Sequence, residues 1–263
     1  MGAGYRYLVS WGQHRSAAAA RNSLAEPSPA FTELRPLRGI LFDLPGVFHD
    51  ASRWRRWLWQ LAARMGAARE MDSFFAPWDA RFAADVFCGK RNHAEACEAF
   101  LLDAGLTRCQ VEEVQAASEA RRRAWEIDAR PMPGFREAVL RLRADGMSLG
   151  LLADSGRTSE ELRGHLNKFV PAEAITAVVS SCDLECARPD ARCYRAGLAA
   201  LGLPAEQVLF VGSEIAELAA AQSLGLAAAA LNQPEFPAAD LHLESFADLP
   251  SRLSPRSAHA ATG

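Results

Sequence analysis

Residues 39–46 read GILFDLPG, a short apolar run followed by an acidic residue and a Pro-Gly pair. An unbroken apolar run of this length fits a strand that is buried on both faces of a parallel sheet. Such sheets carry their sites at the carboxyl ends of the strands. Asp43, the last residue of the strand pattern, therefore stands where chemistry is expected.

The chain after Pro133 alternates between two apolar periodicities. Spacing typical of helices alternates with short apolar runs typical of strands. The predicted helices lie in GFREAVLRLRADG, SEELRGHLNKF, DARCYRAGLAALG and EIAELAAAQSLG, and the predicted strands in SLGLLAD, AITAVVSS, QVLFVG and LAAAAL. This alternation predicts an α/β fold, a doubly wound parallel sheet of about five strands with helices on both faces.

The stretch between the first strand and this alternation shows helical periodicity only. It includes RWRRWLWQLAARM, HAEACEAFLLDAG and VEEVQAASEARRRAWE, and two prolines end it. The sequence therefore predicts a separate helical bundle inserted into the α/β core. The predicted domains are a flexible N-terminal extension at 1–37, a core at 38–49 and 131–250, a helical cap at 50–130 and a disordered tail at 251–263.

The composition is that of an ordinary globular protein and excludes two classes of partner. The chain has 263 residues, of which 49% are hydrophobic and 23% charged, and its net charge is −3. This charge creates no field that would hold a polyanion, so nucleic acid is excluded as the main partner. No apolar run approaches the ~18 residues that span a bilayer, and the first residues lack the apolar core of a secretory signal. We expect a cytoplasmic protein with no membrane partner, and the oligomeric state stays open.

Four segments, in order, resemble the motifs of the haloacid dehalogenase (HAD) superfamily, which contains phosphatases, phosphomutases and dehalogenases. They are LFDLPGVFHDA, LGLLADSG, ARPDARCYRAGLAALGL and VLFVGSEIAELAAAQSLGL. The resemblance covers residues 38–250 and implies a Rossmann-like core with a helical cap. It also implies an aspartate nucleophile, a second acid that moves protons, and Mg²⁺ held by carboxylates.

The resemblance assigns roles to individual positions of the first three motifs. Asp43 takes the nucleophile position, and the acid/base position falls on Pro45, which cannot transfer a proton. The hydroxyl position of the second motif falls on Ala153, with Ser155 nearby. Arg188 stands where the family has a lysine that stabilises negative charge. Ser155 and Arg188 are therefore candidate anion-binding residues.

The fourth motif departs from the pattern of a strong metal site. Ser213 stands where phosphatases have the carboxylate that binds the metal directly, and Glu214 and Glu217 are the acidic residues that remain nearby. Together with Asp43 they form the candidate ligand set. Because Mg²⁺ prefers anionic oxygen, we expect Mg²⁺ binding to be weak or absent.

Two functions remain open at this point. The changes at Pro45, Ala153 and Ser213 favour a protein that is impaired or inactive as a phosphatase and binds a small anionic molecule or a protein partner in the ancestral cleft. The alternative is an active hydrolase with Asp43 as nucleophile, either a weak phosphatase or an enzyme like the 2-haloacid dehalogenases. That branch works without metal, and Tyr194 matches a tyrosine of its anion site.

Overall fold

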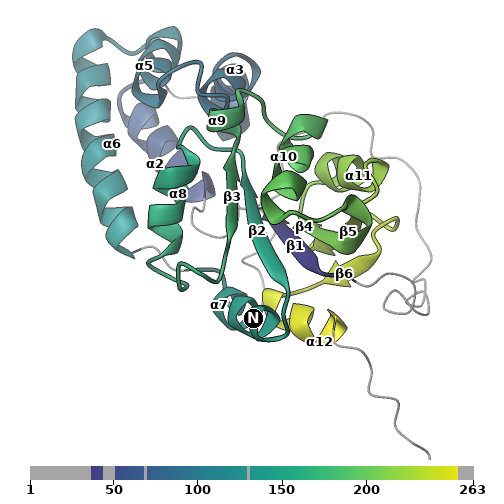
Figure 1. The fold of residues 1–263 in the computed structure, drawn as a ribbon. Helices are drawn as coiled ribbons and strands as arrows, with labels where there is room; N and C mark the ends of the chain where they lie inside the picture. The colour runs from purple at the N-terminus through teal and green to yellow at the C-terminus, as the bar shows by residue number, and fades with distance from the viewer. Residues whose placement is uncertain (1–36, 44–50, 68–69, 129–130, 254–263) are drawn as a thin grey trace, which may run out of the picture.

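A single parallel sheet forms the centre of the molecule (Figure 1). The computed structural model describes residues 37–43, 51–67, 70–128 and 131–253. The sheet order is β3-β2-β1-β4-β5-β6, and every neighbouring pair is parallel. The strands are β1 (Gly39–Asp43), β2 (Ser148–Ala153), β3 (Ala177–Ser180), β4 (Val208–Gly212), β5 (Ala227–Leu231) and β6 (Leu241–Leu243). The α/β prediction is confirmed, with one strand more than the sequence indicated.

The additional strand, β6, is too short and too mixed in burial to be predicted from sequence. It has only three residues, LHL, and its burial runs from half-buried through exposed to buried. It pairs in parallel with β5 at the edge of the sheet. A run this short carries too little periodicity to identify a strand from sequence.

Helices cover both faces of the sheet, each over its own apolar cluster. One face carries α7 (Phe135–Ala144), α8 (Ser159–Leu166) and α12 (Leu249–Leu253), and the other carries α10 (Ala191–Leu201) and α11 (Ile215–Ser223). The rings of Phe42, Phe135 and Phe246 meet edge to face on the first face, with centres 5.3–6.0 Å apart. Because both faces are buried, β1, β4 and β5 are apolar throughout, apart from Asp43 at the end of β1.

A bundle of helices follows β1 and lies beside the core (Figure 1). It contains α2 (Ala51–Arg64), α3 (Met71–Arg81), α4 (Ala83–Phe87), α5 (His93–Asp103) and α6 (Arg108–Asp128), and no strand occurs in 51–67 or 70–128. Its centre is aromatic, with Phe74, Phe75, Trp78 and Phe100 buried against one another. This bundle, called the cap below, therefore has an apolar core of its own.

The two ends of the described chain differ from the predicted boundaries. Residues 251–253 belong to α12, which packs against α7, although the sequence placed them in a disordered tail. Leu37 packs against the core, although it was predicted to belong to the flexible extension. Residues 1–36 and 254–263 lie outside the described residues. Both corrections arise because a single apolar side chain beside a core gives no periodic signal.

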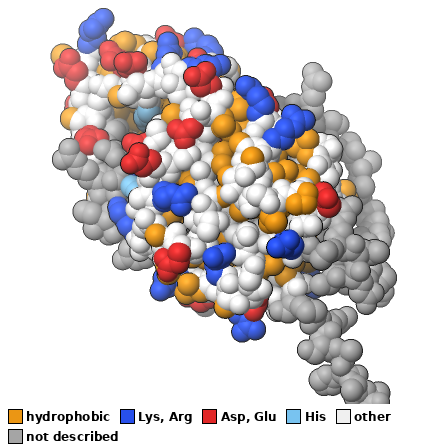
Figure 2. All heavy atoms as spheres, viewed as in Figure 1, with side chains coloured by type: hydrophobic (Ala, Val, Ile, Leu, Met, Phe, Trp, Pro, Cys, Tyr) orange, Lys and Arg blue, Asp and Glu red, His pale blue; other side chains and the backbone are white. Residues whose placement is uncertain are grey.

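Charge is distributed without a dominant sign. Figure 2 shows acidic and basic side chains interspersed over the visible face. Among the described residues, no helix is both long enough and apolar enough to cross a membrane.

Candidate active site

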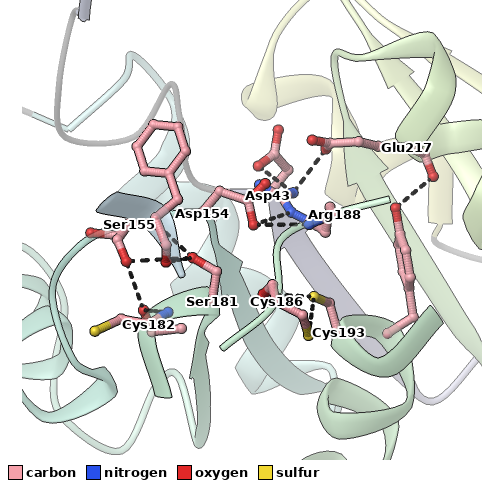
Figure 3. A network of polar contacts seen from close by, with 12 residues as sticks. Asp43, Asp154, Ser155, Ser181, Cys182, Cys186, Arg188, Cys193 and Glu217 are labelled. Carbon is pink, nitrogen blue, oxygen red and sulfur yellow. Dashed lines mark hydrogen bonds and ion pairs between the residues drawn. The ribbon is translucent and has the colours of Figure 1, made fainter. Parts of the chain in front are cut away.

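Charged side chains from four loops meet at the carboxyl edge of the sheet (Figure 3). Asp43 ends β1, Asp154 follows β2, and Glu217 lies in the first turn of α11, just after β4. Arg188 comes from the loop between the short helix α9 (Ser181–Leu184) and α10. The parallel topology brings these four residues together, because all the preceding strands end at the same edge.

The Arg188 guanidinium is the centre of this cluster. Its Nη1 lies 2.5 Å from Asp43 Oδ1 and 2.9 Å from Glu217 Oε2, and its Nε lies 3.4 Å from Asp154 Oδ1. The Arg188 backbone N–H also donates to Asp154 Oδ1, at 3.2 Å. The Arg188 side chain is only 1% exposed and that of Asp43 only 3%. One buried cation therefore contacts carboxylates from three loops.

Burial and crowding shift the pKa values of this cluster. Burial opposes the charge of Arg188, but Asp43, Glu217 and Asp154 outweigh it and hold the pKa of Arg188 well above its usual value. Burial also raises the pKa of Glu217 well above its usual value, since Arg188 lowers it less than burial and the neighbouring carboxylates raise it. Burial and the charge of Asp43 raise the pKa of Glu214 as well. Arg188 thus stays charged, while Glu217 takes up a proton more easily than an ordinary glutamate does.

Tyr194 supports the cluster from α10. Its side chain is fully buried, its ring meets Phe210 edge to face at 5.4 Å, and its hydroxyl donates to the Glu217 backbone carbonyl at 2.9 Å. Burial raises the pKa of Tyr194, so the hydroxyl keeps its proton. The hydroxyl has one proton, which it donates to the Glu217 carbonyl. In this arrangement Tyr194 holds the first turn of α11 in place.

Ser155 lies in the loop after β2 and is hydrogen-bonded both within that loop and to α9. Its backbone N–H donates to Ser181 Oγ at 2.9 Å, and its own Oγ accepts the Arg157 backbone N–H at 3.1 Å. The Ser155 hydroxyl can still donate its proton, which is the contact an anion would need. The structure therefore places Ser155 beside Ser181, in the loop next to Asp154.

Two buried thiols lie next to the Arg188 loop. Cys186 Sγ and Cys193 Sγ are 3.6 Å apart, and the Cys193 thiol also contacts the Cys186 carbonyl at 3.4 Å. Burial raises the pKa of Cys193, so this thiol is protonated. The pair packs the two ends of the segment that contains Arg188 against each other.

Two of the candidate metal ligands, Ser213 and Glu217, are engaged with other protein groups. Ser213 offers a neutral hydroxyl, and its backbone carbonyl accepts from Gln233 Nε2 at 3.2 Å. The Glu217 carboxylate is paired with Arg188. In the described ranges, no group of three or more His, Cys, Asp or Glu side chains is arranged to hold a metal ion. Pro45, which the family resemblance places at the acid/base position, lies outside these ranges.

The sequence matches the profile of the haloacid dehalogenase-like hydrolases over residues 37–225, more than half of the chain. The chain belongs to this family. A predicted phosphoglycolate phosphatase from Haemophilus somnus is similar in structure, with a TM-score of 0.58, 16% identity, and coverage of 83% of this chain and 99% of that one. No curated protein matches the sequence.

Other family structures of comparable similarity span different chemistries. A 2-haloacid dehalogenase from Pseudomonas syringae has a TM-score of 0.56, 17% identity, and coverage of 82% of this chain and 98% of that one. A β-phosphoglucomutase from Clostridium difficile has a TM-score of 0.54, 13% identity, and coverage of 81% and 93%. At these identities the likeness concerns the fold, and the reaction has to be argued from the site.

Sequence reasoning gave no individual role to two residues that the structure places beside the site. Asp154 received no role, although it directly follows an apolar strand and so obeys the same placement rule as Asp43. That rule was sufficient to find it. Ser181 also received no role. Its hydroxyl donates to the Phe87 carbonyl at the end of α4, and no local pattern of the family motifs encodes this tertiary contact.

Proposed function

We propose that this member of the family is impaired as a Mg²⁺-dependent phosphatase and binds a small anionic molecule at the carboxyl edge of its sheet. The observation that carries the proposal is the Arg188 guanidinium, which contacts both Asp43 and Glu217. A buried organic cation there supplies the positive charge that phosphatases of the family obtain from metal. A protein partner in the same cleft is the other occupant that this proposal admits.

The remaining chemistry of the site supports impairment as a phosphatase. Pro45 has no proton to give to a leaving oxygen, and loss of a general acid costs about 10²–10⁴-fold in rate. Ser213 contributes no negative charge to a metal ion. Glu217 is paired with Arg188, so a metal ion would have to displace the guanidinium first. A magnesium ion also gives up its water reluctantly, and this makes such a displacement unfavourable.

The charges of the cluster favour a ligand with a single negative charge. Carboxyl groups of Asp43, Asp154 and Glu217 contact Arg188, and the Glu214 carboxyl is close enough to feel its charge. A phosphate monoester dianion would meet this acidic surface with twice the repulsion of a carboxylate monoanion. Protonation of Glu217 reduces the repulsion for the phosphate dianion and for the carboxylate monoanion. The dianion is still repelled more strongly than the monoanion. Small monocarboxylates are therefore the preferred class.

A second candidate function follows from the pairing of Asp43. Asp43 lies 2.5 Å from a permanently charged guanidinium, which places positive charge beside its carboxyl group without a metal ion. An ionised carboxylate can displace a leaving group from carbon, forming an ester that water later hydrolyses. Attack on a 2-haloacid breaks the carbon–halogen bond, and the halide departs with the bonding electron pair. Such a reaction needs no proton donor for the leaving group, so the loss at Pro45 does not matter.

One assay separates these functions. The chain is incubated with a panel of phosphomonoesters and 2-haloacids, in Mg²⁺ and in EDTA, with Asp43→Asn as the control. The proposal predicts no Mg²⁺-dependent release of phosphate. Release that requires both Mg²⁺ and Asp43 would overturn it. Halide release in EDTA that disappears in Asp43→Asn would establish the second candidate.

A further inference from the structure

We propose that Ser181 is a positioning residue that couples the cap to the loop after β2, the loop that carries Asp154 and Ser155. It does so through one buried hydroxyl that is hydrogen-bonded on both sides. This role follows from the contacts of Ser181 and its neighbours, which are the same whatever the reaction or the ligand.

The Ser181 hydroxyl bridges core and cap (Figure 3 shows its core side). Its Oγ accepts the Ser155 backbone N–H at 2.9 Å and donates to the Phe87 carbonyl, at the end of α4, at 2.7 Å. A hydroxyl has one proton and two lone pairs, so both bonds form at once. The Ser155 carbonyl lies 3.4 Å from the same oxygen. The Phe87 carbonyl is closer, so it is the favoured acceptor of the hydroxyl proton.

Burial makes this bridge effective. Ser181 is only 2% exposed, so water does not compete for its hydrogen bonds while the cap is in place. A buried polar group that loses its partner costs more than an exposed one. The bond to Phe87 therefore resists separation of α4 from α9, the two helices that meet at this point.

Two glycines show how closely the cap approaches the core here. A Cβ added at Gly156, on the core side, would lie 3.1 Å from the backbone oxygen of Val86 and 3.1 Å from its Cγ1. A Cβ added at Gly89, on the cap side, would lie 2.8 Å from Cys182 Sγ. Backbone of each part thus contacts the other part directly on both sides of Ser181. This close approach keeps the Phe87 carbonyl within reach of the hydroxyl.

The neighbouring Ser180 provides a matched comparison. It is fully buried, its hydroxyl lies 2.5 Å from the Arg157 carbonyl and 3.3 Å from that of Ser155, and it accepts the Cys182 N–H at 3.2 Å. All these partners belong to the core. Ser180 and Ser181 therefore support the same loop, and of these two hydroxyls that of Ser181 is the one bonded to the cap.

Opening of the cap has a direct consequence for the site. When α4 leaves α9, the Ser181 hydroxyl loses the Phe87 carbonyl as its acceptor, and the Ser155 carbonyl, 3.4 Å away, is the protein acceptor that stays within reach. The loop beside Asp154, which positions Arg188, is then held by a different hydrogen bond. Movement of the cap is in this way transmitted to the residue that holds the central cation.

Hydrogen–deuterium exchange on the full chain tests the coupling. Ser181→Ala is compared with Ser180→Ala, and exchange is followed at two places, the amides of 86–89 in the cap and those of 155–157 in the core. We expect Ser181→Ala to speed exchange at both places, by about two- to tenfold for the loss of one hydrogen bond. Ser180→Ala should speed it in the core segment only. Ser181→Thr, which keeps the hydroxyl, should restore protection of the cap segment.

Two results would overturn the proposal. One is unchanged exchange at 86–89 in Ser181→Ala, and the other is an equal increase there in Ser180→Ala. If Ser181→Ala does not fold, Gly156→Ala replaces it, because this variant separates Val86 from the core and leaves both hydroxyls in place. Failure of Gly156→Ala to speed exchange at 86–89 would also contradict the proposal. None of these readouts depends on turnover, so they remain separate from the test of function.

Discussion

The Arg188 cluster and the Ser180–Ser181 pair lie at the same edge of the sheet and are held by different forces. The first is ionic, with one buried guanidinium shared by Asp43, Asp154 and Glu217. The second is neutral, with hydroxyls bonded to backbone groups. The ionic cluster joins loops of the core, and the neutral one joins the core to the cap. The ionic and the neutral contacts are therefore sensitive to different perturbations.

Arg188→Ala should have the largest effect, and it breaks the ionic cluster. Removing one partner of a buried ion pair leaves uncompensated charge and costs about 3–5 kcal/mol. We expect this loss in the free energy of unfolding from urea titration at neutral pH. The loss should shrink as the pH falls, because the carboxyl groups take up protons and no longer need the cation. A loss equal at pH 5 and pH 8 would contradict the ionic account.

Gly89→Ala tests the neutral contact between cap and core. Gly89 has φ +66°, where an L side chain costs about 1–2 kcal/mol, and the added Cβ also meets Cys182 Sγ, where overpacking costs about 1–3 kcal/mol. Gly202 also has φ +66° and has nothing within 4 Å of the added Cβ, so Gly202→Ala is the matched control. Urea denaturation should show a larger loss for Gly89→Ala. Equal losses would mean that cap and core are not in close contact here.

These regions also show what the sequence could predict. The motifs located Asp43, Arg188 and Glu217 because each stands at a strand end or in a loop whose position the parallel topology determines. The motifs did not indicate that Arg188 would pair with the Glu217 carboxylate, which was expected to bind metal. That outcome depends on the reach of a guanidinium, which is larger than the ammonium of the family's lysine.

Other contacts had no sequence signal at all. The Tyr194 hydroxyl donates to the carbonyl of Glu217, 23 positions along the chain. The Ser181 hydroxyl donates to the carbonyl of Phe87, 94 positions away in the chain. Both partners are backbone carbonyls, which every residue possesses, so no residue type marks them in advance. The helical class of the cap followed from periodicity, whereas the place where it touches the core required the structure.

Glu217→Gln should change the pH dependence of stability. The pKa of Glu217 is raised in the folded chain, chiefly by burial, so folding favours its protonated form. Its stabilising contribution is complete below the unfolded value near 4.5 and is lost as the pH rises through the folded pKa. Glu217→Gln should flatten this decline above pH 4.5 in thermal denaturation. Tyr194→Phe keeps the Glu217 carboxyl group and should retain the fall in stability above pH 4.5. Loss of this fall in Tyr194→Phe would show that a group other than Glu217 causes it.

Asp103→Ala should have the smallest effect, and it separates charge from burial. Asp103 pairs with Arg81 at 2.8 Å, but the two side chains are 48% and 55% exposed. Exposed pairs of this kind contribute about 0–1 kcal/mol, because water and salt screen them. The free energy of unfolding should therefore change far less than in Arg188→Ala. A comparable change would show that burial is not what distinguishes the Arg188 cluster.

Calorimetric titration of the parent chain with Mg²⁺ tests most directly whether Arg188 replaces a metal ion in this site. The guanidinium is paired with Asp43 and Glu217, and Ser213 offers only a hydroxyl. We predict no binding heat at millimolar Mg²⁺ at neutral pH. Binding with a sub-millimolar Kd that disappears in Asp43→Asn would contradict the account, because the metal would then share the carboxylate that Arg188 holds.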